Sequence, residues 1–382
     1  MPAPTLAVAG ILLLVVWPGA AAGQPRQPPG ARTVDCLATY RLAADQYRAG
    51  DIDKAAATLQ RVDGEQLKIV VDWLKFMRGV PASSQRLTTP PQSLFVWERR
   101  TLLSAGMLHV DLAIAAYLTQ RHTDFFFQTD LAAQLFAIAD QPRAGTAEPA
   151  GTAARRSAVA IGTKLLGDGA LGLAEPYLSG AIQRFPDEPP LLLAFATLLE
   201  TKTSQLVQLV FVFDDPMVFG RARTSRDARL KDAEKAFERV LAVDPACVEA
   251  RVRLAHVHVL QHDDARAASL LTDALAAHPP PEWTYLAHLM LGGTRERSGQ
   301  FAAAMQMYAD AVTIRPQGQS AYIALSHAMY ASGDPASAAA ALDRLFALHL
   351  TPISQDPWWG YPFGDWTVAD PMLRALRDEA RR

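Results

Sequence analysis

The stretch GQFAAAMQMYADAVTIRP, residues 299–316, decides the fold of this chain. It holds a glycine, then an alanine five positions on, then an aromatic residue four further on, and a proline twelve positions after the alanine. The spacing from alanine to proline occurs four times: Ala174/Leu178/Pro186, Ala233/Phe237/Pro245, Ala267/Leu271/Pro279 and Ala304/Tyr308/Pro316. A spacing that recurs this often indicates an internal repeat, and repeat arrays usually present a binding surface.

The physical chemistry of these positions predicts a pair of antiparallel helices in each repeat. A glycine precedes the small residue by five positions at Gly50, Gly169, Gly299 and Gly333. Glycine adopts positive φ without steric cost, so it suits the tight turn between two helices. The alanine lets the second helix pack closely on the first, and the residue four positions later lies on the same face. The proline then ends the pair.

The first helix of each repeat carries a leucine followed by a small residue, at Leu254-Ala255, Leu291-Gly292 and Leu325-Ser326. With the alanine and proline positions, this resembles the tetratricopeptide repeat pattern W-x2-L-G-x2-Y, A-x3-F, P. Among the residues at the tryptophan position only Tyr322 is aromatic, and His258, Arg295 and Met329 replace the tyrosine. The resemblance covers about 230–350, with a weaker match at 155–190 and a half-match at 35–64. It implies an all-α, right-handed solenoid of helix-turn-helix units with a non-repeat aromatic C-terminal tail.

Linkers and breaks in the repeat divide the chain further. Pro245 and Pro279 are 34 positions apart, whereas Pro186 and Pro245 are 59 apart, which indicates an insertion within one repeat. The insertion is apolar (LVQLVFVFDDPMVFG, 206–220), so it either packs on the array or docks a partner. The expected segments are a signal peptide (1–23), a linker (24–32), an N-terminal helical lobe (33–140), a linker (141–154), the repeat array (155–350) with its insertion at 203–227, and the tail with a terminal helix (351–382).

The N-terminus has the pattern of a secretory signal. Residues 6–17 are apolar but too short to span a bilayer of ~30 Å, and small residues at 20–23 offer a cleavage site. The stretch before them lacks Lys and Arg, so a cytosolic protein with an apolar N-terminal tail is the alternative. No other stretch reaches transmembrane length without charges or prolines. We therefore expect export to the periplasm or outside, with no disulfide between Cys36 and Cys247 because the repeats separate them in space.

Composition and motifs argue against several classes of function. A formal net charge of −2 and the lack of a basic run argue against a nucleic-acid partner. The sequence GDGALG (167–172) matches the spacing of a dinucleotide-binding loop, but a helical pattern precedes it and Gly169 already fills a repeat turn. No nucleophile or paired-carboxylate motif is present, so we expect neither an enzyme nor a cofactor.

The resemblance also implies which residues face a partner. In tetratricopeptide repeat proteins the first helices of the pairs line a concave groove that holds a peptide or a helix. The register places on that face Val252, His256, Val259, Arg297, Ile323, His327 and Tyr330. Val252 and His256 stand where a family subset has its carboxylate-binding Lys and Asn, so a carboxylate clamp is not expected. Arg253 and Arg297 are candidates for pairing with acidic groups.

The tail is rich in aromatic residues and interrupted by proline and glycine, which predicts a non-helical segment. Its aromatic residues are Trp358, Trp359, Tyr361, Phe363 and Trp366. The first interpretation is a cap over the apolar end of the last repeat. The second is a recognition strip for a peptide or a glycan.

The hypothesis that follows is a protein-interaction scaffold of the cell envelope, with a protein or peptide partner. Two alternatives stay open. One is a metal-dependent enzyme that uses His256, His258 and His262, although these lack the glutamate of an H-E-x-x-H site. The other is a carbohydrate-binding module built on the aromatic tail.

Overall fold

A computed structural model describes residues 30–62, 99–140, 152–204, 226–348, 356–363 and 369–382, with the side chains of 30–37 and 363 left out. These residues contain helices and no strand. The expected signal peptide, most of the two linkers and most of the insertion lie outside them, as do the side chains of Cys36, Phe363 and Trp366. Cys247 is a free thiol.

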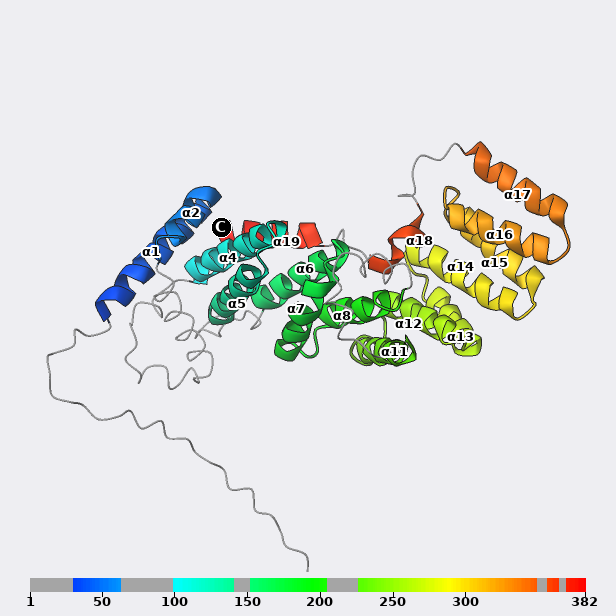
Figure 1. The fold of residues 1–382 in the computed structure, drawn as a ribbon, viewed down its shortest axis with the longest axis horizontal. Coiled ribbons are helices and arrows are strands. Elements are labelled where there is room, and N and C mark those ends of the chain that lie inside the picture. Colours follow the sequence, from blue (N-terminus) through cyan, green and yellow to red (C-terminus); the bar gives the residue numbers. More distant parts are fainter. Residues whose placement is uncertain (1–29, 63–98, 141–151, 205–225, 349–355, 364–368) are drawn as a thin grey trace, which may run out of the picture.

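The described helices pack in consecutive antiparallel pairs that form one elongated row (Figure 1). The pairs are α1 (Gly30–Arg48) with α2 (Ile52–Leu59), α4 (Arg99–Leu118) with α5 (His122–Ala139), α6 (Thr152–Gly167) with α7 (Leu171–Arg184), α8 (Pro189–Thr201) with α11 (Arg226–Val243), α12 (Val248–Leu260) with α13 (Asp264–Ala276), α14 (Pro281–Arg297) with α15 (Phe301–Ile314), and α16 (Gln319–Ala331) with α17 (Pro335–Ala347). The insertion thus separates two helices, α8 and α11, that pack as a pair.

The turns inside the pairs confirm the glycine positions. Gly50, Gly169, Gly299 and Gly333 all have positive φ, between 72° and 92°. In the last of these turns the Gly333 N–H donates to the Tyr330 carbonyl and the Asp334 N–H to the Met329 carbonyl, which closes the end of α16. Gln120 and His262 adopt the same positive φ at two turns where the sequence has no glycine.

The glycine-rich sequence 167–172 is one of these helix-to-helix turns, not a phosphate loop. It runs from the last residue of α6, Gly167, into the first turn of α7. Because the preceding element is a helix, the strand that a dinucleotide-binding loop requires is not there. Gly169 has a φ of 72°, so it serves the turn.

The repeat alanines lie fully buried at the contact between paired helices, and the residue four positions later fills the space beside them. Ala304 and Tyr308 of α15 are 0% and 3% exposed. A Cβ added at Gly292 of α14 would overlap the Tyr308 ring. The small residue of the Leu-Gly step therefore makes room for the aromatic residue of the next helix.

We expect Gly292→Ala to lower the free energy of unfolding by about 0–2 kcal/mol. The added methyl group overpacks the contact with Tyr308, which costs ~1–3 kcal/mol, and alanine recovers part of this through its higher helix propensity. The matched control is Gly180→Ala in α7, where a Cβ would meet open space and should stabilise by about 0.5–1 kcal/mol. Urea denaturation measures both, and a stabilising Gly292→Ala would contradict the packing.

α4 is a core helix, although by length and composition it is the one helix of the described chain that could cross a membrane. Its 20 residues lie between α1, α5 and α19 (Ala369–Arg381), and 67% of its apolar window is buried. Its Asp111 accepts hydrogen bonds from Tyr47 Oη at 2.9 Å and from Arg377 Nη2 at 2.6 Å. A satisfied carboxylate inside this bundle marks α4 as part of the packed core.

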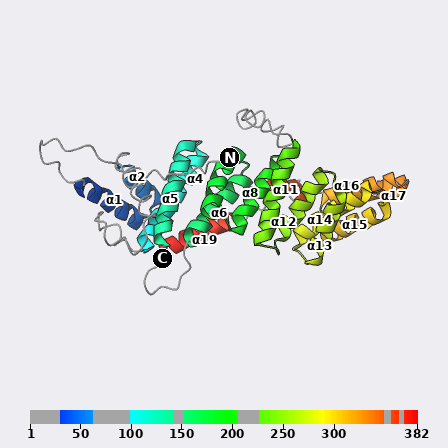
Figure 2. The ribbon, with the colours of Figure 1, turned by 90° about the horizontal axis from the view of Figure 1, so that it is seen from below.

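The chain returns to its N-terminal helices at its end, since α19 packs against α4 and α6 (Figures 1 and 2). Leu373, Leu376 and Ala380 are buried in this contact. At its rim Arg156 Nη1 lies 2.7 Å from Glu379 Oε2, and in its buried part the Ser104 hydroxyl donates to the Ala380 carbonyl at 2.6 Å. α19 thus joins the last residues of the chain to helices more than two hundred positions earlier.

Candidate functional site: a pocket closed by the C-terminal tail

The described part of the tail is helical, which corrects the sequence expectation. Pro357–Gly360 forms one α-helical turn, α18, and Tyr361–Phe363 forms a 3-10 turn, η2. Proline is tolerated in the first turn of a helix because its missing N–H has no partner there. The Asp356 carboxylate caps this turn by accepting from the Trp358 N–H at 3.0 Å.

This segment does not cap the last repeat. It packs on α8, α12 and α14 in the middle of the array, while α17 ends the row away from it (Figure 1). Asp356 accepts from Tyr285 Oη at 3.1 Å and from the Ser320 N–H at 2.7 Å, so it links the first turns of α14 and α16. The cap interpretation is wrong because these buried polar partners hold the tail on the inner helices instead.

Tyr361 anchors the tail on a buried cluster of charges. Its hydroxyl donates to Glu200 Oε1 at 2.5 Å, and Arg253 Nη1 donates to Glu200 Oε2 at 3.0 Å. The Arg253 guanidinium also donates from Nη2 to the Tyr361 carbonyl at 3.1 Å and lies over the Tyr361 ring. We call Glu200, Arg253, His256 and Tyr361 the anchor cluster.

The two charged residues of the anchor cluster, Glu200 and Arg253, are almost fully buried. Arg253 and Glu200 are 1% and 3% exposed. Burial alone would raise the pKa of Glu200, but Arg253, His256 and Tyr361 together hold that pKa below its usual value. Burial and the Glu200 charge raise the pKa of the Tyr361 phenol, so the phenol keeps its proton. Arg253 Nε also donates to Glu249 Oε1 at 2.8 Å, so the guanidinium lies between two carboxylates. Arg253 is therefore used inside the fold rather than offered to a partner.

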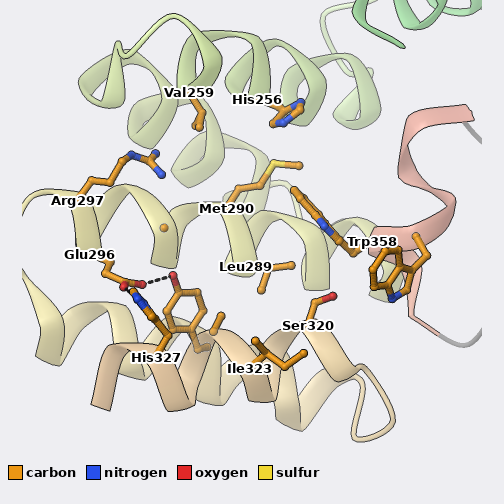
Figure 3. A pocket seen from close by; sticks show the side chains of 14 residues that line it. His256, Val259, Leu289, Met290, Glu296, Arg297, Ser320, Ile323, His327 and Trp358 are labelled. Carbon is orange, nitrogen blue, oxygen red and sulfur yellow. Dashed lines mark hydrogen bonds and ion pairs between the residues drawn. The ribbon is translucent and has the colours of Figure 1, made fainter. Parts of the chain in front are cut away.

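A pocket of about 620 Å³ lies beside the tail, between α12, α14 and α16 (Figure 3). α12 contributes His256 and Val259, and α16 contributes Ile323 and His327 on the opposite side. Leu289 and Met290 of α14 lie between them, as Figure 3 shows. The remaining lining residues are Gly293, Glu296, Arg297, Tyr308, Ser320, Ala324, Trp358 and Trp359.

The structure brings five of the seven predicted groove residues together in this pocket: His256, Val259, Arg297, Ile323 and His327. Val252 is not among them because it is buried in the core beneath the pocket helices. Tyr330 is exposed but lies outside the lining. The five residues that line the pocket therefore lie on one side of the array.

The sequence predicted one lining residue of α14, Arg297, but not the others, and it did not predict that the tail borders the same pocket. Leu289, Gly293 and Glu296 continue the three-to-four spacing that leads to Arg297, so the register itself could have found them. Nothing in the sequence placed Trp358 and Trp359 in the same pocket as the repeat helices. Trp358 stacks on Tyr361 with ring centroids 5.7 Å apart, and this stack forms the wall next to His256.

Two ion pairs lie at the end of the pocket away from Trp358 (Figure 3). Arg297 Nε donates to both carboxylate oxygens of Asp264 at 3.1 Å, and the His327 ring pairs with Glu296. Glu296 also accepts from Tyr308 Oη at 2.8 Å. This end of the pocket is polar, whereas the aromatic end is apolar.

The three histidines proposed as metal ligands do not converge. His256 Nδ1 lies 2.7 Å from Glu200 Oε1, His258 is buried in α12, and His262 is the positive-φ residue of the following turn. Within the described ranges no group of three or more His, Cys, Asp or Glu side chains is arranged to hold a metal ion. The metal hypothesis therefore has no geometric support in this part of the chain.

Comparison with known families identifies the repeats in the C-terminal part of the array. Residues 226–289 and 297–350 match the family described as "Tetratricopeptide repeat". These residues form tetratricopeptide repeats. The tetratricopeptide segment contains α11 to α17 and therefore most of the pocket lining.

Solved structures with a similar fold include "Crystal structure of MamA protein", with a TM-score of 0.38, 16% identity, and coverage of 52% of this chain and 98% of that one. Another is "MamA 41-end from Desulfovibrio magneticus RS-1", with a TM-score of 0.39, 18% identity, and coverage of 51% and 94%. Likeness at this level carries no function over to the present chain. No curated protein matches the sequence significantly.

Proposed function

We propose that this protein is a binding scaffold whose tetratricopeptide groove holds a peptide segment of a partner protein. The observation that carries the proposal is the pocket between α12, α14 and α16, the first helices of three consecutive repeats. Its walls are mostly apolar, and two of its large apolar residues, Ile323 and Trp359, are 52% and 49% exposed. Exposed apolar surface rimmed by polar groups is typical of protein interaction sites.

Binding rather than catalysis fits the groups present. Glu296, the carboxylate among the pocket lining residues, accepts a hydrogen bond from Tyr308 and pairs with His327, so neighbouring side chains already engage it. A preformed groove on rigid helices lowers the ordering cost of binding an extended partner.

Selection of random peptides on the whole protein tests this function. We expect selected peptides to lose affinity by roughly tenfold or more for Ile323→Arg, because the substitution places a charge among the apolar lining residues. Phe346→Arg on α17 is the matched control, since Phe346 is also exposed but lies outside the pocket. Binding that responds to Phe346→Arg and not to Ile323→Arg would reject the groove.

We also propose that the protein acts in the cell envelope after export. Support comes from the apolar stretch at 6–17 followed by small residues at 20–23. N-terminal sequencing of protein recovered from the envelope fraction should find a new terminus at or just after residues 20–23. Leu13→Arg should hold the chain in the cytosol with Met1 or Pro2 at its start, and an uncleaved wild-type chain in the cytosol would reject export.

A further inference from the structure

The concave surface of the array already holds one peptide segment, and that segment belongs to the chain itself. Residues 356–363 lie across α8, α12 and α14. The pocket begins beside this segment and extends from it towards α16. An acidic side chain, Asp356, binds Tyr285 and the start of α16, and an aromatic residue, Tyr361, inserts against Arg253. The surface therefore accommodates an acidic and an aromatic side chain a few residues apart.

The tail also closes one end of the groove. Trp358 and Trp359 line the pocket at the end where α18 contacts α14. Trp359 is half-exposed and available for contact, whereas Trp358 is supported from behind by the Tyr361 ring. A supported aromatic wall with an exposed neighbour suits a large apolar side chain.

The opposite end presents a guanidinium and an imidazole to solvent. In each of its two pairs the basic side chain is more exposed than the carboxylate: Arg297 is 43% exposed against 28% for Asp264, and His327 is 70% exposed against 15% for Glu296. The carboxylates lie deeper and hold the two basic side chains in place. A partner group that approaches from solvent meets the guanidinium and the imidazole first, which favours an acidic side chain.

The pocket is short enough for one peptide to contact its aromatic end and its polar end at the same time. On α14 the lining runs from Leu289 to Arg297, which is about 12 Å at 1.5 Å per residue. An extended peptide covers this distance in about four residues. The two chemical preferences are therefore separated by a definite spacing.

Building on the proposed function, we propose that the groove recognises an extended peptide of a partner protein. The peptide places a large apolar side chain against Trp358 and Trp359 and, three or four positions away, an acidic side chain on Arg297 and His327. The chain's own tail thus supplies one wall of the ligand site. Trp359 and Arg297 are the residues that determine specificity.

The test selects random peptides with blocked termini for binding to the full protein. The affinity of each selected peptide is then measured for the wild type and for variants of the protein. We expect enrichment of a large apolar residue and an Asp or Glu three or four positions apart. Trp359→Ala should weaken these peptides by roughly tenfold or more, as for a central aromatic contact. Arg297→Gln should weaken them severalfold and abolish the difference between each peptide and its Glu→Gln counterpart.

Arg374→Gln serves as the control, because Arg374 is exposed on α19, a helix that packs against α4 and α6 and lies away from α14 and α16 in Figure 1. This inference is wrong if the selected peptides lose affinity for Ile323→Arg but lack the apolar and acidic pattern, or if Trp359→Ala does not change their affinity; the proposed function then still holds. Both are wrong if Ile323→Arg also leaves the affinity unchanged. Circular dichroism spectra that match the wild type show that each variant is folded.

Discussion

Arg253→Met is expected to lower the free energy of unfolding by about 3–5 kcal/mol, the larger of the substitution effects that this fold predicts. The substitution removes the cation that neutralises Glu200 inside the anchor cluster, where both side chains are almost fully buried. The carboxylate then has only His256 and the Tyr361 hydroxyl for support. Urea denaturation followed by circular dichroism measures the loss.

Arg297→Met is the matched control, because it breaks an ion pair at the surface. Arg297 and Asp264 are both partly exposed, and water screens their attraction. Exposed pairs contribute ~0–1 kcal/mol, so the control should stay within that range. Equal losses for Arg253→Met and Arg297→Met would contradict the role given to the anchor cluster.

The loss for Arg253→Met should also depend on pH. In the wild type the pKa of Glu200 is lowered on folding, so ionised Glu200 contributes to the free energy of unfolding. That stabilisation is present above the unfolded pKa and is lost as the pH falls through the folded pKa. Without Arg253, burial dominates and the folded pKa should rise above the unfolded value of about 4.5. The variant's deficit should therefore be smallest in acid and should grow as pH rises from 4 towards 7.

Removal of residues 364–382 is expected to destabilise the N-terminal helices by about 3–6 kcal/mol. Leu373 and Leu376 are each 2% exposed, and burying a leucine contributes ~1.5–3 kcal/mol. Truncation also leaves Asp111 without Arg377. Hydrogen exchange followed by mass spectrometry should show lost protection in α4 and α6 with protection retained in α14 and α16, since repeat arrays are stabilised mainly by neighbours.

Arg374→Ala is the control for the truncation, because its side chain lies on the exposed face of α19. It should change protection in α4 and α6 by little. Unchanged protection of these helices in the truncated chain would mean that α19 is not needed to cover them. Loss of protection along the whole array would instead indicate one cooperative unit.

The repeat made the helical array predictable from the sequence. Gly299, Ala304 and Tyr308 each have a local steric role, so a fixed spacing in the sequence becomes a fixed geometry in every pair. For the same reason five of the seven groove residues could be placed. The turns at Gln120 and His262 were not predicted, because the packing of the two helices can impose a positive φ on a residue other than glycine.

The tail was not predictable because its partners are distant in the sequence. Tyr361 meets Glu200 over a separation of 161 residues and Arg253 over 108, and no local pattern relates them. The prolines and glycines of the tail predicted an irregular segment. A helical turn nevertheless forms, because Asp356 caps it and Pro357 is its first residue, where a proline is tolerated. The position of a non-repeat segment depends on tertiary contacts rather than on periodicity.

The return of α19 to α4 has a consequence for synthesis. Ser104 leaves the ribosome 276 residues before Ala380, its hydrogen-bond partner. At ~5–20 residues per second this interval lasts roughly 15–55 s, during which the face of α4 that α19 covers has no permanent partner. The two helices of each repeat can pack on each other as soon as both have emerged. Residues 356–363 and α19 instead dock on helices made long before them, so an array of local contacts completes its folding with long-range steps.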